Sequence, residues 1–179
     1  MNVYEAIRTR RSVRRYSPRP IPDSTLARLR DALRLAPSAC NFQPWRFIFV
    51  TDQKLRAELG QAAHQQTFIA QAPLIVVACG FPDRAYQGMG GHGNSVEVDV
   101  AIALDHLTLT AVAEGLGTCW IGAFDEPAVK RLLEIPQEVK VVALTPVGFP
   151  KSSSLIRPAA KGERKTEGEV FSVNRFAPR

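Results

Sequence analysis

Six arginines crowd the first twenty residues of the chain, and they are the first candidates for chemistry. They are Arg8, Arg10, Arg11, Arg14, Arg15 and Arg19. A guanidinium group is a planar fork that binds phosphate oxygens in pairs, and a serine hydroxyl adds a further donor. Arg10 and Ser12 could therefore grip a phosphate while Arg14 reaches another part of the same ligand. Taken alone, the segment also fits a solvated basic turn or a nucleic-acid patch.

A second basic group lies near the end of the chain, at Lys161, Arg164 and Lys165. The formal net charge is +6 at pH 7, which favours phosphorylated cofactors, nucleic acids or membrane surfaces as partners. The hydrophobic fraction of 45% and the charged fraction of 22% are those of an ordinary globular protein. A wholly disordered or fibrous chain is therefore excluded.

A polar loop bounded by prolines is expected at residues 37–44. Asn41 and Gln43 carry both donors and acceptors, which recognition of a heteroaromatic ring edge requires. Trp45 follows the loop, and we expect it to anchor the loop in the core rather than to act in catalysis.

The glycine-rich segment 115–124 is a third candidate, because glycines let a ligand approach the backbone closely. Small residues at Gly122 and Ala123 would leave their N–H groups accessible. An ordinary helix end followed by a strand is the alternative. The run 88–93 has only a superficial likeness to a dinucleotide fingerprint, so a mobile lid is the better interpretation. His92 could meet substrate there or be an exposed loop residue.

The sequence has no Ser-His-Asp order, no His-Glu-x-x-His motif and no Walker loop. Cys40, Cys79 and Cys119 are widely spaced among apolar or small residues, and we expect buried, reduced thiols rather than disulfides or a metal site. Without a nucleophile system or a metal cluster, chemistry in this chain needs a borrowed cofactor.

The elements that position these segments are predicted from periodicity and caps. Helices are expected over 2–8, 23–36, 52–63, 67–70, 95–114 and 127–134, and strands over 47–50, 74–79, 118–121 and 139–147. Asn2, Asp23 or Ser24, and Asp52 are the expected caps of the first three helices. Their irregular alternation predicts an α+β fold with a mixed sheet flanked by helices, in a single domain over residues 1–179.

The tail from about residue 150 to residue 179 is too long for an ordinary loop, and it ends in an alternating stretch at 170–176. We expect it to leave its own subunit and pack on a partner. No apolar run is long enough to cross a bilayer, and no secretory signal follows the first arginines, so a cytoplasmic protein without a membrane partner is expected.

Taken together, these segments resemble the FMN-dependent nitroreductase family over nearly the whole chain. The stretches that carry the resemblance are 7–15, 36–47, 99–125 and 142–150. The resemblance implies an α+β homodimer with two FMN sites at its interface and a C-terminal tail exchanged across it. The chain departs from the family in having little sequence between Cys79 and Ser95, and in having Thr166 where a tail proline is common.

The resemblance also assigns roles to residues. It implies that Arg10 and Ser12 bind the FMN phosphate and ribityl chain, helped by the Arg11 backbone. Arg14 would lie near the pyrimidine side of the flavin. Three contacts would come from the other subunit, at Pro37, Ser38 and Asn41. The backbone of Trp120, Ile121, Gly122 and Ala123 would face the N5 edge of the flavin. Arg164 would be a second phosphate ligand, helped by Lys165, and Gln65 would contact the flavin.

The activity implied is transfer of a hydride from NADH or NADPH to FMN and then reduction of a nitroaromatic, quinone or related small molecule, in ping-pong order. No side chain is assigned as a catalytic group, and no metal is expected. Two alternatives stay open: a flavoprotein of the same fold with other chemistry, such as reductive dehalogenation or flavin breakdown, and a basic nucleic-acid-binding module. Against the second stands the lack of a recognition helix.

Overall fold

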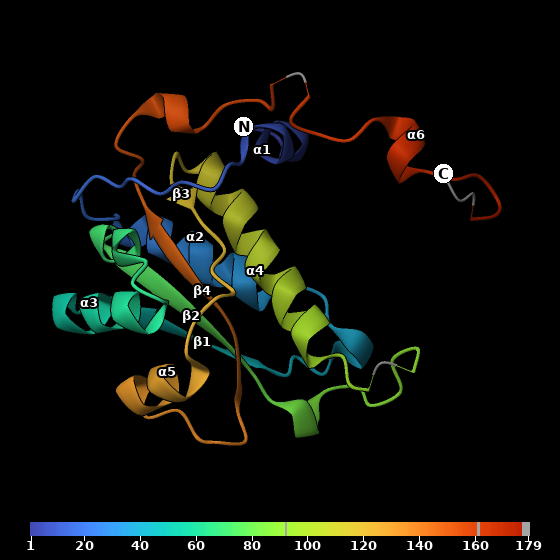
Figure 1. Cartoon of the computed structure of the whole chain (residues 1–179), viewed down its shortest axis with the longest axis horizontal. Coiled ribbons are helices and arrows are strands. Elements are labelled where there is room, and N and C mark those ends of the chain that lie inside the picture. Colours follow the sequence, from blue (N-terminus) through green and yellow to red (C-terminus); the bar gives the residue numbers. More distant parts are fainter. Residues whose placement is uncertain (92, 161, 177–179) are drawn as a thin grey trace.

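A four-stranded antiparallel sheet forms the centre of the computed structural model, which describes residues 1–91, 93–160 and 162–176 (Figure 1). The strand order is β1-β2-β4-β3, and the strands are β1 (Trp45–Val50), β2 (Leu74–Gly80), β3 (Gly117–Thr118) and β4 (Lys140–Gly148). Each neighbouring pair is antiparallel. The expected mixed sheet is therefore wrong for these strands, and a parallel contact is recorded only as the isolated bridge between Ser12 and Thr118.

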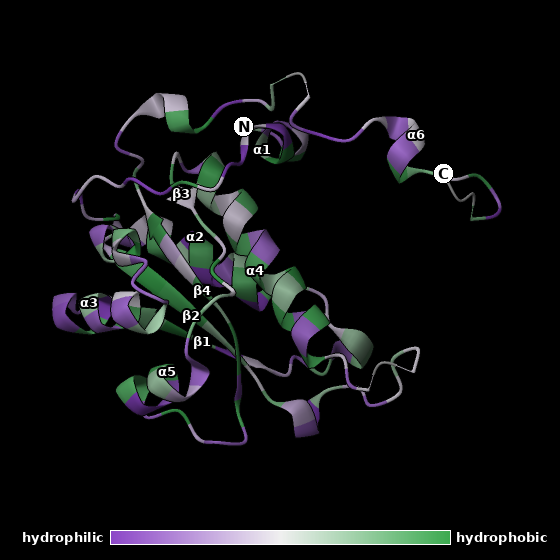
Figure 2. Ribbon diagram, viewed as in Figure 1, coloured by the Kyte–Doolittle hydropathy of each residue, from purple (hydrophilic) through white to green (hydrophobic). Residues whose placement is uncertain are grey.

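Helices cover both faces of the sheet, so the α+β prediction is confirmed (Figure 1). One face packs against α2 (Asp23–Arg34) and α4 (Val96–Ala113), and the other against α3 (Gln53–Ala62) and α5 (Glu126–Leu133). A hydrophobic core lies on each face of the sheet, and strand β2 contributes side chains to both. Hydrophobic colouring runs along this strand in Figure 2. Its side chains alternate between the two faces, and all are buried, as the continuous apolar run predicted.

Side-chain caps explain where several helices begin. Asn2 and Glu5 form a capping box at the start of α1 (Val3–Thr9), and Asp52 accepts from the Leu55 N–H at the start of α3, both as predicted. The predicted cap of α2 is wrong. Pro22 occupies the N-cap without a side-chain bond, and Asp23 lies in the first turn, where a carboxylate favours the helix dipole instead.

Helix α4 crosses the sheet as the long central helix that the sequence predicted. Leu104 and Leu107 are fully buried in the core shared with α2. The helix is apolar on its outer side as well, and Val98 is 43% exposed. α4 spans about 27 Å at 1.5 Å per residue, so the segments at its two ends lie far apart.

The tail leaves the body of the protein after β4 and runs past α1 (Figure 1). It contains the short helix α6 (Glu167–Val170), and the alternating stretch that follows forms no strand within residues 171–176. Phe171 and Phe176 are 71% and 89% exposed. Phe171 and Phe176 thus find no cover in their own chain, whereas Leu155 and Ile156 at the start of the tail pack against Val13, Tyr16 and Ala72.

Candidate functional site

The arginine turn and the glycine-rich segment are brought together by backbone pairing. The Val13 N–H donates to the Thr118 carbonyl at 2.8 Å, beside the bridge from Ser12 to Thr118. Gly117 permits this approach, because a Cβ there would lie 2.5 Å from Val13 Cγ2. The two segments are more than a hundred residues apart in the chain, and they lie side by side in the fold.

Cys119 marks where the predicted ligands of the turn converge. Burial raises the pKa of the Cys119 thiol, while the Arg14 charge, a hydrogen bond with Ser12 and the Arg10 charge oppose that rise. All three groups act on one sulfur, so Arg10, Ser12 and Arg14 all lie in the neighbourhood of the Cys119 side chain.

The Arg11 side chain is the feature of the turn that sequence reasoning missed. Its Nε and Nη2 atoms are buried without a hydrogen-bond partner, and only Nη1 donates, to the Arg10 carbonyl. Burial lowers the pKa of Arg11, and the charges of Arg164, Arg157 and Arg10 lower it further, against the opposing charge of Glu163. Buried guanidinium donors are normally satisfied, so a ligand with two or more acceptor oxygens and negative charge fits this position.

The tail segment beside Arg11 is held by an ion pair that the sequence reasoning did not identify. Arg157 Nη2 lies 2.6 Å from Glu163 Oε1, and the Ala160 N–H donates to the same carboxylate at 2.9 Å. These bonds hold the pKa of Glu163 down at about 2. The Arg164 Nη1 in turn donates to the Glu163 carbonyl at 2.7 Å, so Arg164 is fixed at the end of this turn.

Lys165, the predicted helper of Arg164, is exposed. Lys161 lies outside the described residues, as does His92 of the predicted lid. The rest of that loop, from Phe81 to Asn94, contains one short 3-10 turn at Pro82–Arg84.

The backbone at Gly122 and Ala123 is open to solvent. A Cβ at Gly122 would meet only the Trp120 Nε1 atom, at 3.7 Å. Trp120 is 42% exposed, whereas Ile121 is buried and exchanges backbone hydrogen bonds with Leu144. Trp120 and Gly122 line a pocket of about 420 Å³ together with Glu97 and Ala101 of α4. The segment therefore presents an accessible backbone, which Ile121 anchors to β4.

The loop after α3 borders this open backbone. Gln66 Nε2 donates to the Ala123 carbonyl at 3.2 Å and to the Ala63 carbonyl at 3.0 Å. Gln65, the predicted flavin contact, is exposed one residue earlier with a φ of 60°. The predicted neighbourhood is thus present, and it is Gln66 that holds Ala123.

The loop that contains Pro37, Ser38 and Asn41 is closed by its own hydrogen bonds. Ser38 Oγ accepts from the Gln43 N–H at 2.9 Å, and Gln43 Nε2 donates to Asn41 Oδ1 at 3.1 Å. Pro37 and Asn41 are exposed and Ser38 is half-buried. The loop lies at the start of α4, because the Ala39 N–H donates to Asp99 Oδ1 at 2.9 Å.

Within one chain, this loop and the arginine turn are not brought together. The turn lies beside Thr118, which follows the C-terminal end of α4, and the loop lies at its N-terminal end (Figure 1). Asp99, which holds the loop, is about 21 Å of helix from the end of α4 at Ala113. The loop and the arginine turn therefore lie at separate places within one chain.

Of the three cysteines, Cys79 and Cys119 are buried and free, as expected, but Cys40 is exposed. The expectation for Cys40 was wrong because the loop carries it in a left-handed turn, with φ at 51°, that faces outward.

No group of His, Cys, Asp and Glu in the described part of the chain is arranged to hold a metal ion. None of the described helices is long and apolar enough to span a membrane.

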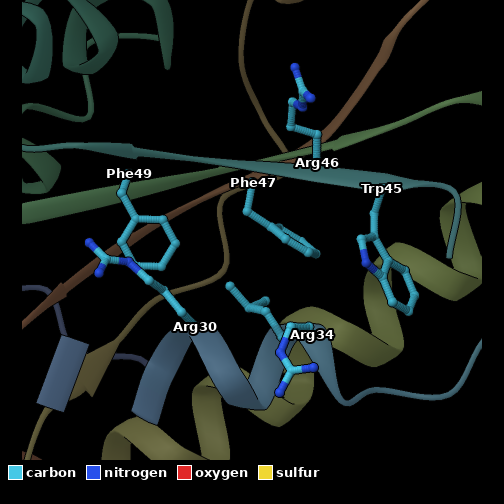
Figure 3. A pocket seen from close by; sticks show the side chains of 7 residues that line it. Arg30, Arg34, Trp45, Arg46, Phe47 and Phe49 are labelled. Carbon is cyan, nitrogen blue, oxygen red and sulfur yellow. The ribbon is translucent and has the colours of Figure 1, made fainter. Parts of the chain in front are cut away.

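A separate pocket of about 410 Å³ lies between α2 and β1 (Figure 3). Trp45, Phe47 and Phe49 point from the strand toward the helix, and the Arg30 guanidinium lies 5.3 Å from the centre of the Phe49 ring. Trp45 packs against the core, which is the anchoring role that we expected. The pocket contains none of the predicted flavin contacts.

A comparison with protein-family models decides which family has this arrangement. The model described as "Nitroreductase family" matches residues 7–149, which include both the arginine turn and the glycine-rich segment. The chain belongs to the nitroreductase family. As a member of that family, it is an NAD(P)H-dependent flavin oxidoreductase.

Relatives of this nitroreductase-family chain carry several names. A candidate NADH dehydrogenase/NAD(P)H nitroreductase of Methanothermobacter thermautotrophicus is 30% identical over 154 residues, 84% of this chain and 78% of that protein. A 5,6-dimethylbenzimidazole synthase of Rhodobacter capsulatus is 33% identical over 175 residues, 82% of this chain and 83% of that protein. An NAD(P)H FMN reductase of Bacillus subtilis is 28% identical over 184 residues, 94% of this chain and 74% of that protein.

Solved structures agree with the fold. A nitroreductase family protein from Clostridium novyi superposes with a TM-score of 0.79 at 35% identity, covering 86% of this chain and 88% of that one. One from Clostridium difficile gives 0.87 at 24% identity, covering 98% and 100%.

Proposed function

We propose that residues 1–179 form one flavin-binding domain, two copies of which hold FMN between them. The enzyme would use NADH or NADPH to reduce nitroaromatic, quinone or related electron-poor compounds. The observation that carries the proposal is the Arg11 side chain, whose Nε and Nη2 atoms are buried without partners in a basic turn that pairs with the glycine-rich segment at Thr118.

The residues present fit FMN at both of its ends. Its phosphate carries two negative charges and several acceptor oxygens, which would satisfy Arg11 and offset the repulsion from Arg10 and Arg164. The flat isoalloxazine ring suits the accessible backbone at Gly122 and Ala123. Ser12, which pairs with Thr118, would bind the ribityl chain.

Two copies of the chain are proposed because one copy leaves both the site and an apolar surface incomplete. The loop with Ser38 and Asn41 lies apart from the arginine turn within one chain, and a second copy can supply it. Val3, Tyr4 and Ile7 of α1 are 71%, 66% and 53% exposed. Exposed apolar surface of this kind, together with the uncovered phenylalanines of the tail, is typical of an interface between subunits.

FMN, when bound, supplies the hydride chemistry, and the protein supplies binding, orientation and electrostatics. The Arg14 guanidinium would place positive charge beside the pyrimidine side of the ring. The Gly122 and Ala123 N–H groups would donate hydrogen bonds at its N5 edge. Gln66 holds the following peptide, because its Nε2 donates to the Ala123 carbonyl. No side chain is required as a nucleophile.

Other chemistry on the same fold is the main alternative, since one relative is named 5,6-dimethylbenzimidazole synthase. Reductive dehalogenation and flavin breakdown would use the same binding residues with another oxidising substrate.

The buried free thiols of Cys79 and Cys119 suit a reducing, cytoplasmic environment.

The test begins with purified protein that is mixed with FMN, desalted and examined by absorption spectroscopy. Retained flavin bands support the proposal, and a colourless protein contradicts it. Oxidation of NADH and of NADPH is then followed with a nitroaromatic, with a quinone and with free flavin. Flavin binding without turnover of any of these acceptors would favour the alternative chemistry. Salt-sensitive binding of DNA by a flavin-free protein would favour the nucleic-acid-binding module.

A further inference from the structure

Two buried polar side chains at the start of α4 have no place in the site described so far. Ser95 and Asp99 are 1% and 2% exposed. Ser95 Oγ donates to Asp99 Oδ2 at 2.7 Å, and Asp99 Oδ1 accepts from the Ala39 N–H at 2.9 Å. The carboxylate lies in the first turn of a long helix, where the helix dipole favours negative charge.

The loop that Asp99 holds is strained. Cys40, Asn41 and Gln43 have φ values of 51°, 56° and 50°, in the left-handed region that residues with a Cβ disfavour. Such a conformation persists only where surrounding contacts impose it. The bond from Ala39 to Asp99 ties the start of this turn to α4, and the Phe81 N–H closes its end by donating to the Pro44 carbonyl at 2.9 Å.

Ser95 extends the same connection to the loop between β2 and α4. The Ser95 N–H donates to the Tyr86 carbonyl at 2.9 Å, and the Tyr86 N–H donates to Ser95 Oγ at 3.2 Å. A continuous set of hydrogen bonds therefore runs from Tyr86 through Ser95 and Asp99 to Ala39. It joins the loop between β2 and α4, at Tyr86, to the predicted flavin-contact loop.

We propose that Asp99 and Ser95 are a positioning pair. Asp99 fixes the 38–43 loop for flavin binding, and Ser95 holds the loop between β2 and α4 in place at Tyr86. Neither side chain touches the flavin or the substrate. The inference rests on the proposed function, because it assigns a purpose to the loop only if that loop contacts FMN. Because Asp99 bonds to one loop and Ser95 to the other, we expect Asp99 to affect FMN affinity and Ser95 to affect KM for the electron acceptor.

The experiment measures FMN affinity and steady-state kinetics in full-length variants. Asp99→Ala removes the acceptor of the Ala39 N–H, and we expect the FMN dissociation constant to rise roughly tenfold, the usual scale for a lost buried hydrogen bond. Asp99→Asn keeps an oxygen toward Ala39, and we expect a rise of only about threefold. Ser95→Ala leaves that bond intact, so FMN affinity should stay within about twofold while KM for the electron acceptor rises.

Thr108→Val is the matched control. Thr108 is a buried residue of the same helix, and its hydroxyl donates to the Asp105 carbonyl at 3.0 Å, away from both loops. The control should lose thermal stability while FMN affinity stays at the wild-type level. A matching loss of FMN affinity in Thr108→Val and Asp99→Ala would reduce Asp99 to a general structural role and overturn the inference.

The outcomes separate this inference from the function on which it rests. If Asp99→Ala fails to fold, Asp99→Asn decides, and unchanged FMN affinity and kinetics in Asp99→Asn and Ser95→Ala overturn the inference. Wild-type protein that binds FMN and turns over, with insensitive variants, removes the positioning pair alone. Wild-type protein that never binds FMN overturns both proposals.

Discussion

The two ends of α4 carry the two halves of the proposed site, and they are built in opposite ways. At the C-terminal end, Arg11 keeps buried nitrogens without partners among other cations. At the N-terminal end, Asp99 and Ser38 bind backbone N–H groups and close their loop. The C-terminal end has unpaired cationic nitrogens and no anion to bind them. At the N-terminal end the loop's own hydrogen bonds are made, and they hold backbone angles in the left-handed region. The difference indicates that one end binds by charge and the other by preformed shape.

The largest expected effect comes from removing the unpaired guanidinium. Arg11→Ala should lower FMN affinity about a hundredfold, because charged hydrogen bonds to the phosphate are lost. The protein without flavin should remain folded, since the mutation also relieves repulsion. Arg10→Ala should act in the same direction. Fluorescence titration measures the affinity.

Arg8→Ala is the control for this series, because Arg8 is an exposed arginine of α1 that faces Tyr4, with its guanidinium 5.6 Å from the ring centre. Its FMN affinity should equal that of wild type. Full affinity in both Arg11→Ala and Arg10→Ala would break the comparison between the two ends of α4.

A change of ligand tests the same end without mutation. Riboflavin has the ring and the ribityl chain of FMN but no phosphate, and we expect it to bind roughly thirtyfold more weakly. In the Arg11→Ala variant this preference for FMN should shrink. Equal binding of both ligands to wild type would show that charge contributes little at the arginine turn.

The exposed tail sharpens the comparison by testing whether a second copy is required. Phe171→Ser with Phe176→Ser removes two side chains that are 71% and 89% exposed in a single chain. If a partner covers them, the dimer dissociation constant should rise by about tenfold or more, measured by sedimentation. Leu35→Ser, at a 67% exposed position after α2, is the control. An unchanged dimer would remove the tail from the interface.

The smallest expected effect concerns the turn that presents Arg164. The Arg157 bond holds the pKa of Glu163 at about 2, below its ordinary 4.5. A depressed carboxyl pKa stabilises the fold above the ordinary value, and this contribution is lost as the pH falls toward 2. The amide shift of Ala160 should therefore titrate with a midpoint near 2, and Glu163→Gln should abolish the transition. A midpoint near 4.5 would show that the turn is open in solution.

Local signals were sufficient to predict most elements of the fold, although the strand expected over 118–121 is only Gly117–Thr118 and α6 was not predicted. The capping box at Asn2 and the apolar run of β2 depend on neighbouring residues only, and both were read correctly. The antiparallel strand order was not predictable in the same way, because it depends on contacts between distant segments. Pro22 replaced the predicted cap of α2 for a local reason, since the fixed φ of proline set the start of the helix.

For the candidate site, residue types indicated segments but not individual atoms. The run of arginines predicted a phosphate site, yet nothing in it distinguished Arg11, with its two buried and unpaired nitrogens, from the other arginines. Gln66 rather than Gln65 holds Ala123, a difference set by the left-handed turn after α3. The link from Asp99 to Ala39 spans sixty residues and has no sequence pattern.

Mixed dimers test the central claim, that each flavin is bound by opposite ends of α4 from two copies of the chain. Arg11→Ala damages one half of the site, and Ser38→Ala with Asn41→Ala damages the other. Each variant alone should bind FMN poorly. Dimers that combine one subunit of each kind contain one site with both defects and one with neither, so they should recover one tightly bound FMN per dimer. Mixed dimers that bind no FMN tightly would show that both halves act within a single chain, and would contradict the account.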